Sequence, residues 1–476
     1  MGYKVEAMIT LTALTESEVQ AIHLATLRIL SETGILLAHP SGRELLCAAG
    51  ASIVGENVLL PSDLVESTIT QCAGEVRLRS RKGTINIWGD GGLHWHNLGG
   101  ARDIYDPHTG SRRRATLRDL CDSTRLLDAL DQVTNITPMF TPQDVHGPSM
   151  SLAMYRHALP HTTKVLQGPG VHTAAEVRYA ARLAAVIGPP EEILSLSVSP
   201  VSPLTFPGDV VEAILEMARL NITFAPLPCP TAGTTAPLSI AGALAQQNAE
   251  VLAAIVLAQL ARSGLPIVYC GRLAMMEPRT GHSVWGGVEL GLASAATVQI
   301  GHRYGLPVNV YGFSSNAHTL DIQSGFERAL NAAIPALAGA DELSGIGEME
   351  AGVMSSFAQI VCDNEMAASV KRLQCGFAVD EDACAVEVIA TTMRGTRNYL
   401  GQKHTSRYLR GGEILLAHLA ERGTWESWEA GERKGMAERA QAEAERLLLE
   451  HIVPPLREDQ EKELDAILDE ASRELK

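Results

Sequence analysis

The chain has 476 residues, with 39 lysines and arginines against 55 aspartates and glutamates, and its formal net charge is −16. A nucleic-acid-binding protein normally presents a basic face to the phosphates, so this charge argues against that class. Hydrophobic residues make up 46% and charged residues 20% of the sequence. This composition provides for a large core and carries too little charge for a disordered chain.

The apolar runs and the cysteine spacing indicate where in the cell the protein is expected. The longest apolar run, residues 251–261, is far shorter than the roughly 20 residues that a membrane-spanning helix needs. No charged start followed by an apolar run, typical of a secretion signal, stands at the N-terminus. The eight cysteines include no C-x-x-C pair and match neither a disulfide framework nor a zinc ribbon. We therefore expect a reduced, cytoplasmic protein without a membrane partner.

The N-terminal segment, residues 1–115, combines a helical pattern with short β-like runs. Thr15 and Glu18 form a capping-box pattern, which predicts a helix that continues to Gly34. Runs at residues 76–81, 84–89 and 93–97 are separated by glycine turns, which predict an antiparallel meander. We expect this segment to pack on the domain that follows.

Strand-like and helical patterns alternate from about residue 116. The strand-like runs fall at residues 133–138, 163–167, 194–199, 222–226, 267–271, 308–312 and 343–347. Repeated βα units predict a parallel sheet, and this many in a row favour an α/β fold of the (β/α)₈ TIM-barrel type over residues 116–400. The eighth strand is either residues 93–97 or a segment near residues 376–379.

The last segment, residues 401–476, is predicted to be helical. From residue 432 onward it is rich in charges of alternating sign, and Pro454-Pro455 separates two helices. This pattern predicts a solvated or docking helix pair.

Common catalytic motifs are missing from the sequence. It contains no G-x-x-x-x-G-K-[ST], no G-x-G-x-x-G after a strand and no G-x-S-x-G. Their absence argues against an ATPase, a dehydrogenase and a serine hydrolase.

His94 and His96 suggest an alternative, a metal-dependent barrel hydrolase, because an i, i+2 pair on a strand points two imidazoles to one side. The central strand-like runs offer no further ligands, so we expect no metal site. Residues 106–110, with His108, resemble the D-x-H-x-x-G motif of corrinoid-carrying domains, but the glycine comes one residue too early. We therefore expect no cofactor-binding residue in this chain and no permanently bound cobalamin.

Aromatic side chains are only 4% of the chain, yet four of them fall at or just after predicted strands: Tyr311, Phe313, Phe140 and Phe206. Period-2 alternation places Tyr311 and Phe313 on one side of their strand. Several rings at one face form a cage suited to a quaternary ammonium, whereas core packing is the alternative for each ring.

Polar side chains at the same strand ends complete the candidate site. We expect Gln167, Arg272 and Asn316 to bind substrate, and Glu348 and His318 to be catalytic. Barrel active sites are built at the carboxyl ends of the strands, which is where these residues fall.

A family resemblance rests on motifs spread along the chain. They are residues 99–102, 106–110, 113, 225–237, 248–250, 277–281, 321–327, 363–365, 404–405, 425–431 and 451–455. In this order they resemble the trimethylamine methyltransferase family of corrinoid-dependent methyltransferases.

The resemblance implies a barrel that moves a methyl group from an amine to Co(I) of a separate small corrinoid protein, so the cobalamin cofactor is carried by a partner. Members that demethylate trimethylamine carry pyrrolysine near the region that aligns with residues 314–321. This chain contains only the twenty standard residues. It is therefore similar to the non-pyrrolysine branch, whose best-known type acts on glycine betaine.

Chemistry agrees with a quaternary amine as substrate. When a quaternary amine gives up a methyl group, it leaves as a neutral tertiary amine. The enzyme therefore needs only to hold the cation, align the methyl carbon and exclude water. The carboxylate of a betaine requires a donor, for which Arg272, His318 and Asn316 are the candidates. We expect glycine betaine as first choice, giving dimethylglycine, with proline betaine, carnitine and γ-butyrobetaine as rivals. A non-catalytic betaine-binding protein is a further alternative, and we expect a homo-oligomer.

Overall fold

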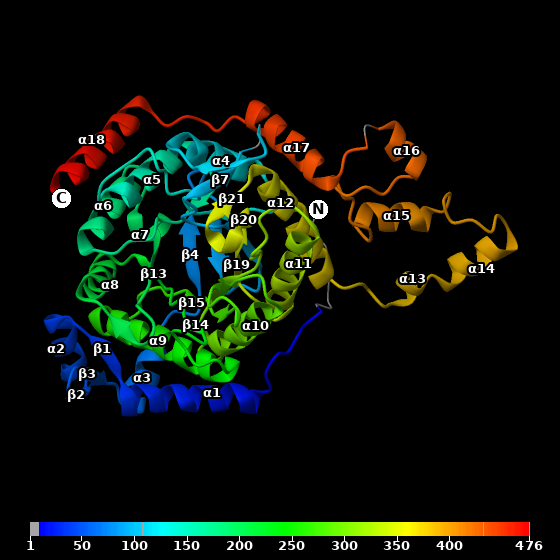
Figure 1. The fold of residues 1–476 in the computed structure, drawn as a ribbon. Helices are drawn as coiled ribbons and strands as arrows, with labels where there is room; N and C mark the ends of the chain where they lie inside the picture. The colour runs from blue at the N-terminus through cyan, green and yellow to red at the C-terminus, as the bar shows by residue number, and fades with distance from the viewer. Residues whose placement is uncertain (1–8, 107–108, 432, 476) are drawn as a thin grey trace.

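The structure is a computed structural model, and it describes residues 9–106, 109–431 and 433–475. The fold is of the mixed α/β type. In Figure 1, a ring of helices surrounds short strands at the centre, and a separate arm, drawn in orange, extends away from that ring.

Eight short strands in the described part lie side by side at the centre in three parallel sheets. They are β6 (His94–Asn97), β9 (Asn135–Ile136), β10 (Val165–Leu166), β11 (Ser195–Val198), β13 (Thr223–Pro226), β15 (Tyr269–Gly271), β18 (Val308–Tyr311) and β19 (Glu342–Ile346). The sheets pair β9 with β10, β11 with β13, and β15 through β18 and β19 to β6. The first and last strands of the set are therefore neighbours.

Backbone hydrogen bonds link these sheets to one another. The Val268 amide donates to the Phe224 carbonyl over 3.0 Å, the Gly168 amide to Ser195 over 2.9 Å, and the Thr134 amide to Trp95 over 3.0 Å. Successive strands are thus also neighbours in space, which is the expected result when each connection is a helix that returns to the next parallel strand.

Helices fill the connections, as the sequence pattern predicts. They are α4 (Leu117–Ala129), α5 (Met150–Ala158), η2 (Leu159–His161), α6 (Ala174–Ala185), α7 (Pro190–Ile193), α8 (Gly208–Leu220), α9 (Ile240–Ala261), α10 (Val288–Arg303), α11 (Ile322–Leu337) and α12 (Phe357–Gln374).

Helix α9 is the one described helix long and apolar enough to cross a membrane, but 83% of its most apolar window is buried inside the protein. It packs against α1 (Glu16–Arg28) and α3 (Ser62–Ile69) on one side and against central strands on the other (Figure 1). A helix covered on both sides is apolar all round, so burial within the protein explains its composition.

The N-terminal segment starts with the predicted helix α1, whose Thr15–Glu18 capping box is confirmed. A π-helical turn, η1 (Ile29–Thr33), ends it at Gly34. A small sheet follows, in which β1 pairs with β3 and β12, and β3 pairs with β2. Its elements are β1 (Ile35–Leu37), α2 (Pro40–Ala48), β2 (Ser52–Val54), β3 (Asn57–Leu59) and β12 (Thr205–Phe206).

The predicted three-stranded meander is only partly correct. Strands β4 (Val76–Arg79) and β5 (Ile85–Trp88) do form an antiparallel pair. The third run, β6, instead pairs parallel with β19, while residues 376–379 form no strand. Trp95 and Asn97 of β6 are both fully buried. Their burial requires a place at the centre of the molecule, which a surface hairpin does not offer.

Two small sheets lie beside the central strands. One has the order β20-β21-β7-β8 and the other β14-β16-β17. Their elements are β7 (Asp103–Tyr105), β8 (Arg112–Arg114), β14 (Thr231–Ala232), β16 (Ala274–Met276), β17 (Ser283–Val284), β20 (Glu348–Met349), η3 (Glu350–Gly352) and β21 (Met354–Ser355).

The C-terminal part forms the arm and then returns to the body. The arm contains α13 (Glu381–Cys384), α14 (Val386–Arg394), α15 (Lys403–Gly411) and α16 (Trp425–Ala430). Helix α17 (Met436–Glu450) packs on α12, and α18 (Glu458–Glu474) packs on α5 and α6. The two helices separated by Pro454-Pro455 are therefore confirmed, and both dock on the helical ring (Figure 1).

Candidate functional site

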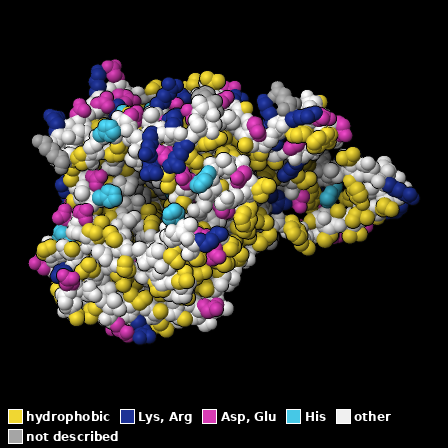
Figure 2. All heavy atoms as spheres, in the orientation of Figure 1, with side chains coloured by type: hydrophobic (Ala, Val, Ile, Leu, Met, Phe, Trp, Pro, Cys, Tyr) yellow, Lys and Arg dark blue, Asp and Glu magenta, His cyan; other side chains and the backbone are white. Residues whose placement is uncertain are grey.

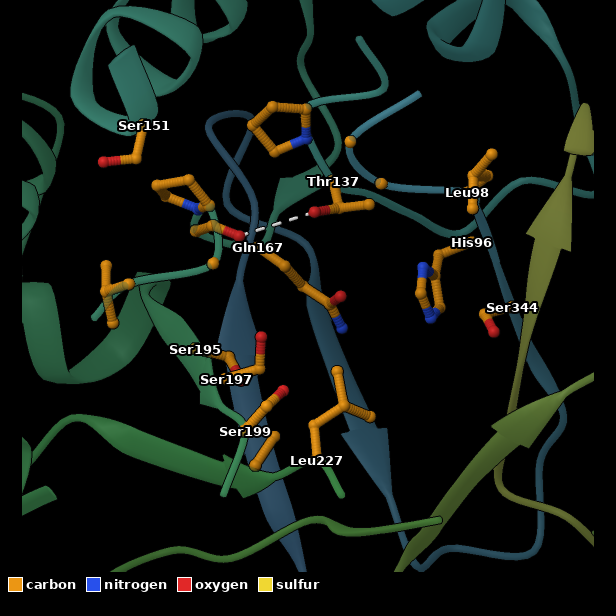
Figure 3. Close-up of a pocket in the computed structure, with 18 of the residues that line it drawn as sticks. His96, Leu98, Thr137, Ser151, Gln167, Ser195, Ser197, Ser199, Leu227 and Ser344 are labelled. Carbon is orange, nitrogen blue, oxygen red and sulfur yellow. Dashed lines mark hydrogen bonds between the residues drawn. The ribbon is translucent and has the colours of Figure 1, made fainter. Parts of the chain in front are cut away.

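A cavity of about 590 Å³ lies at the carboxyl ends of the central strands. Each of the eight strands, or a residue within two positions after it, contributes to its lining. Parallel strands expose their carboxyl ends at the same edge, so residues far apart in the chain converge there. Figure 3 shows Gln167 near the centre of this cavity, between serines on one side and His96 on the other.

Glu342, on β19, is the acidic group of the cavity floor and is 1% exposed. Its Oε1 accepts hydrogen bonds from Asn135 Nδ2 and Gln167 Nε2, each over 2.9 Å. Its Oε2 accepts one from Asn309 Nδ2. Three amide donors, one each from β9 and β18 and one directly after β10, therefore hold this carboxylate in place, and charge-assisted bonds of this kind are among the strong ones.

Arg272, directly after β15, is the basic group of the floor and is 5% exposed. It donates to the carbonyl oxygens of Gly271 and Asn309 over 3.1 and 2.9 Å and to Asn309 Oδ1. Its guanidinium carbon stacks 4.5 Å from the centre of the Tyr311 ring. Asn309 thus contacts Arg272 through its oxygen and Glu342 through its nitrogen, and joins the two opposite charges in one network.

Tyr311 is the aromatic wall of the cavity. Trp285 packs edge-on against it, with ring centres 5.1 Å apart at 81°. Burial raises the pKa of the Tyr311 hydroxyl above its ordinary value, so the phenol stays protonated. Because Arg272 covers part of the ring, a bound cation has to share the Tyr311 surface with the guanidinium.

His96, on β6, offers an unused donor in the floor. It is 8% exposed, and its Nε2 lies 3.1 Å from Asn309 Nδ2. Because that amide nitrogen only donates, Nε2 accepts and the assigned ring proton is on Nδ1. Burial lowers the pKa of His96, which keeps the imidazole neutral. Among the described residues, Nδ1 has no hydrogen-bond partner.

Three of the predicted substrate-binding residues line the cavity: Tyr311, Arg272 and Gln167. The other three aromatic candidates, Phe313, Phe140 and Phe206, are fully buried and are not among its lining residues. Phe313 stacks on Trp95 with ring centres 4.8 Å apart. The structure therefore brings together one of the four predicted cage rings, Tyr311, and two of the polar candidates, Arg272 and Gln167.

The remaining polar candidates lie elsewhere. Asn316 accepts the backbone amides of Trp285 and Gly286 through its Oδ1, each over 2.7 Å, and so holds the loop behind Tyr311. His318 is exposed. Neither side chain is part of the cavity lining.

Glu348 is 1% exposed and accepts a 2.7 Å hydrogen bond from the Ser314 hydroxyl. Burial raises its pKa to about 7. It lies outside the cavity lining, although its charge acts on the Tyr311 hydroxyl. Glu350, two residues further along the chain, forms an ion pair with Arg112.

The two histidines of the possible metal pair have different surroundings. His94 Nε2 lies 2.8 Å from the Ile87 carbonyl oxygen, and its ring packs on Trp88. Over the residues that the structure describes, no group of three or more His, Cys, Asp or Glu side chains is placed to hold a metal ion. His108, of the corrinoid-like motif, lies outside the described residues.

Several lining residues were not among the substrate-binding or catalytic candidates predicted from the sequence: Glu342, Asn309, His96, Ser195, Ser197 and Ser199. One signal was present in the sequence, since the serines alternate with Leu196 and Val198 through a predicted strand. A charged residue at the start of a buried strand, such as Glu342, is a second signal of this kind.

The chain matches a protein-family model described as trimethylamine methyltransferase (MTTB) over residues 2–476. It is 30% identical to the trimethylamine methyltransferase MttB of Desulfitobacterium hafniense (strain DSM 10664 / DCB-2), over 98% of this chain and 95% of that protein. It is 29% identical to the glycine betaine methyltransferase of Desulfitobacterium hafniense (strain Y51), over 97% of each.

A solved structure shares the fold. The monomethylamine methyltransferase MtmB of Methanosarcina barkeri superimposes with a TM-score of 0.50 at 13% identity, covering 92% of this chain and 93% of that one. At this identity the likeness concerns the fold alone.

Proposed function

We propose a reaction for this chain from one premise: the chain belongs to the trimethylamine methyltransferase family and is a methyltransferase. The proposed reaction moves a methyl group from a quaternary amine to Co(I) of a separate corrinoid protein. Glycine betaine is the first-choice donor, and dimethylglycine is then the product. The relative named glycine betaine methyltransferase and the absence of pyrrolysine from the sequence support this choice.

The observation that carries the proposal is the pair of opposite charges in the cavity floor. Arg272 and Glu342 both line the cavity, and Asn309 bonds to both. A betaine has one permanent positive charge and one carboxylate. A floor with one charge of each sign matches such a zwitterion, whereas a simple cation leaves Arg272 without a partner in the ligand.

In the proposed complex, the substrate carboxylate lies toward Arg272 and the donor Nδ1 of His96, and the ammonium lies toward Glu342 and the Tyr311 ring. Ring quadrupoles and carboxylates both attract a quaternary ammonium, which offers no N–H for hydrogen bonding. The cavity walls exclude water around the methyl group, and the fixed floor orients it toward the mouth.

A corrinoid carried by a partner supplies the nucleophilic Co(I) when it docks at the mouth. No residue of this chain is proposed to hold it permanently. The role of this chain is to bind the amine, align one methyl group and keep the floor charges in position, and neither Glu348 nor His318 needs to move a proton for that role.

The proposal includes the architecture. We propose that the eight central strands close into one TIM barrel, with seven strands from residues 116–400, β6 supplied by the 1–115 segment, and the 401–476 segment packed outside. The backbone contacts that link the three parallel sheets support this closure.

We also propose a cytoplasmic homo-oligomer. Figure 2 shows hydrophobic side chains on the surface of the arm. The exposed apolar residues on and next to the arm include Phe377, Val379, Val386, Met393, Leu400, Leu416 and Trp425. Exposed patches of this kind mark association surfaces, so sedimentation of the purified protein tests this part.

Methyl transfer to free reduced cobalamin tests the function. We expect the Co(I) to methyl-Co(III) absorbance change with glycine betaine or another quaternary amine and none with trimethylamine. Arg272→Gln should abolish it, whereas Arg279→Gln, at an exposed arginine outside the cavity, should not. Turnover of trimethylamine without that of any quaternary amine, or amine binding without methyl transfer, would contradict the proposal.

A further inference from the structure

One wall of the cavity consists of three serines from a single strand. Ser195, Ser197 and Ser199 occupy alternate positions on and just after β11, and all three line the cavity. In Figure 3 they follow one another along the strand, on the other side of the view from His96. Leu196 and Val198, which alternate with them, are buried in the core.

The serines form a graded series from floor to mouth. Ser195 is 7% exposed, Ser197 is half-buried and Ser199 is exposed. Alternate side chains on a strand are about 7 Å apart, so the three hydroxyls span on the order of 13 Å. We call Ser195, Ser197 and Ser199 the serine ladder.

The ladder hydroxyls have no partner within the described parts of the chain, since none of them forms a hydrogen bond there. Two other serines of the same cavity differ. The Ser151 hydroxyl donates to Glu176 over 2.7 Å, and the Ser344 hydroxyl lies 3.5 Å from the Val310 carbonyl oxygen. Because Ser195 lines the cavity and its hydroxyl has no hydrogen-bond partner in the described chain, that hydroxyl is available to a ligand in the cavity.

The chemistry of the wall restricts that ligand. A serine hydroxyl is neutral and both donates and accepts, so its best complement is another neutral group that does the same. A quaternary ammonium has no N–H to donate, and a carboxylate finds stronger donors in Arg272 and His96. A hydroxyl group fits the ladder best.

The volume of the cavity agrees with a substrate that has a tail. Cavities of roughly 300–1,000 Å³ hold drug-sized ligands, and this one measures about 590 Å³. Glycine betaine is a much smaller molecule, so it leaves the space along β11 free.

We propose that the serine ladder is a specificity subsite for a hydroxyl group on the tail of the quaternary amine. The inference rests on the proposed function and extends it from betaines in general to hydroxylated ones. The hydroxyl group of the substrate lies between the cavity floor and Ser199, and its depth in the cavity determines which serine it contacts.

Carnitine and γ-butyrobetaine provide a matched pair of probes, because they differ by one hydroxyl group and share the ammonium and the carboxylate. We expect the wild-type protein to bind carnitine about 2- to 12-fold more tightly in titration calorimetry, the range that one neutral hydrogen bond provides. Among Ser195→Ala, Ser197→Ala and Ser199→Ala, at least one should reduce this ratio to about 1.

Ser52→Ala is the control, because Ser52 lies on the exposed strand β2, outside the cavity, and should keep the wild-type ratio. Equal affinities of the wild type for the two amines would overturn the inference without any variant, and so would a preference that survives all three substitutions. If both amines bind and donate methyl groups without preference, the proposed function stands and the ladder subsite fails. If neither amine binds, the ladder subsite fails, and the methyl-transfer assay with glycine betaine then decides the proposed function separately.

Discussion

Two buried sets of charges in this protein differ in what surrounds them. In the cavity floor, Arg272 and Glu342 are joined through Asn309 and line an open space. Between α11 and α12, Arg328 and Asp363 form a direct ion pair of 3.0 Å, and both side chains are 0% exposed. That pair is outside the cavity lining.

The comparison separates charges that hold the fold from charges that are available to a ligand. Arg328 also donates to the Phe313 carbonyl over 2.8 Å, and Asp363 accepts the Gly347 amide over 2.7 Å. The pair therefore fastens the ends of two central strands to two helices. The charges of the cavity floor, by contrast, face an open space, and beside them His96 Nδ1 has no hydrogen-bond partner within the described chain.

The largest expected effect is a loss of stability when the buried Arg328–Asp363 ion pair is broken. Asp363→Ala leaves the Arg328 charge buried without a partner, which should lower the free energy of unfolding by about 3–5 kcal/mol. Denaturant unfolding measures it. The control is Glu443→Ala, which removes one partner of a surface ion pair with Arg446 and should cost less than about 1 kcal/mol. Equally small losses of unfolding free energy in both variants would contradict a structural role for the buried ion pair.

The next effect is a pH dependence of stability from Glu348, which lies behind the cavity. Its folded pKa of about 7 is above its ordinary value of 4.5, so the folded state binds the proton more tightly. Stability should therefore fall as pH rises from about 4.5 to 7 and level off above that, by up to roughly 3 kcal/mol.

Glu348→Gln should remove this contribution and be more stable than the wild type at pH 8. Thermal unfolding across pH 4.5–8 is the measurement. A Glu348→Gln variant with the same slope as the wild type would show that Glu348 does not titrate there.

A smaller effect, on amine affinity, is expected from the charges of the cavity floor. Glu342→Gln removes the acidic charge of the floor, and amine affinity should weaken about 10- to 100-fold, as for loss of one close opposite charge beside the ammonium. Calorimetric titration with glycine betaine measures it. Glu289→Gln, at an exposed glutamate outside the cavity, is the matched control. Unchanged affinity in Glu342→Gln would mean that this charge serves only the fold.

The smallest effect distinguishes two aromatic neighbours. Tyr311→Leu should weaken amine binding by roughly 2- to 30-fold, the range of one cation–π contact. Phe313→Leu should leave affinity nearly unchanged and cost about 1–3 kcal/mol of stability, because Phe313 packs on Trp95 in the core. Affinity and melting temperature are measured on the same preparations, and reversed roles would refute the assignment.

The sequence by itself determined the order of elements. Period-2 and helical patterns from residue 116 onward match the central strands and their helices, and the Thr15 capping box matches the start of α1. These features depend on neighbours within a few residues, which is why a local pattern is enough to predict them. The strand-end rule likewise led to Tyr311, Arg272 and Gln167, which line the cavity.

Only the tertiary structure decided how Tyr311 and Phe313 differ. Simple alternation places them on one side of a strand, but β18 ends at Tyr311, and the amides of Gly312 and Phe313 both donate to the Ser344 carbonyl. Two residues that share one acceptor break the alternation, as in a bulge, and Phe313 packs against Trp95 in the core.

The cavity floor also required the fold. Asn309 and Glu342 are far apart in the chain and become partners through the register of β18 and β19, and His96 joins them from β6 on the other side of β19. A single residue of shift in that register would turn each side chain to the opposite face. Long-range strand pairing sets the register, so local sequence patterns predict the strands without predicting which polar side chains meet in the floor.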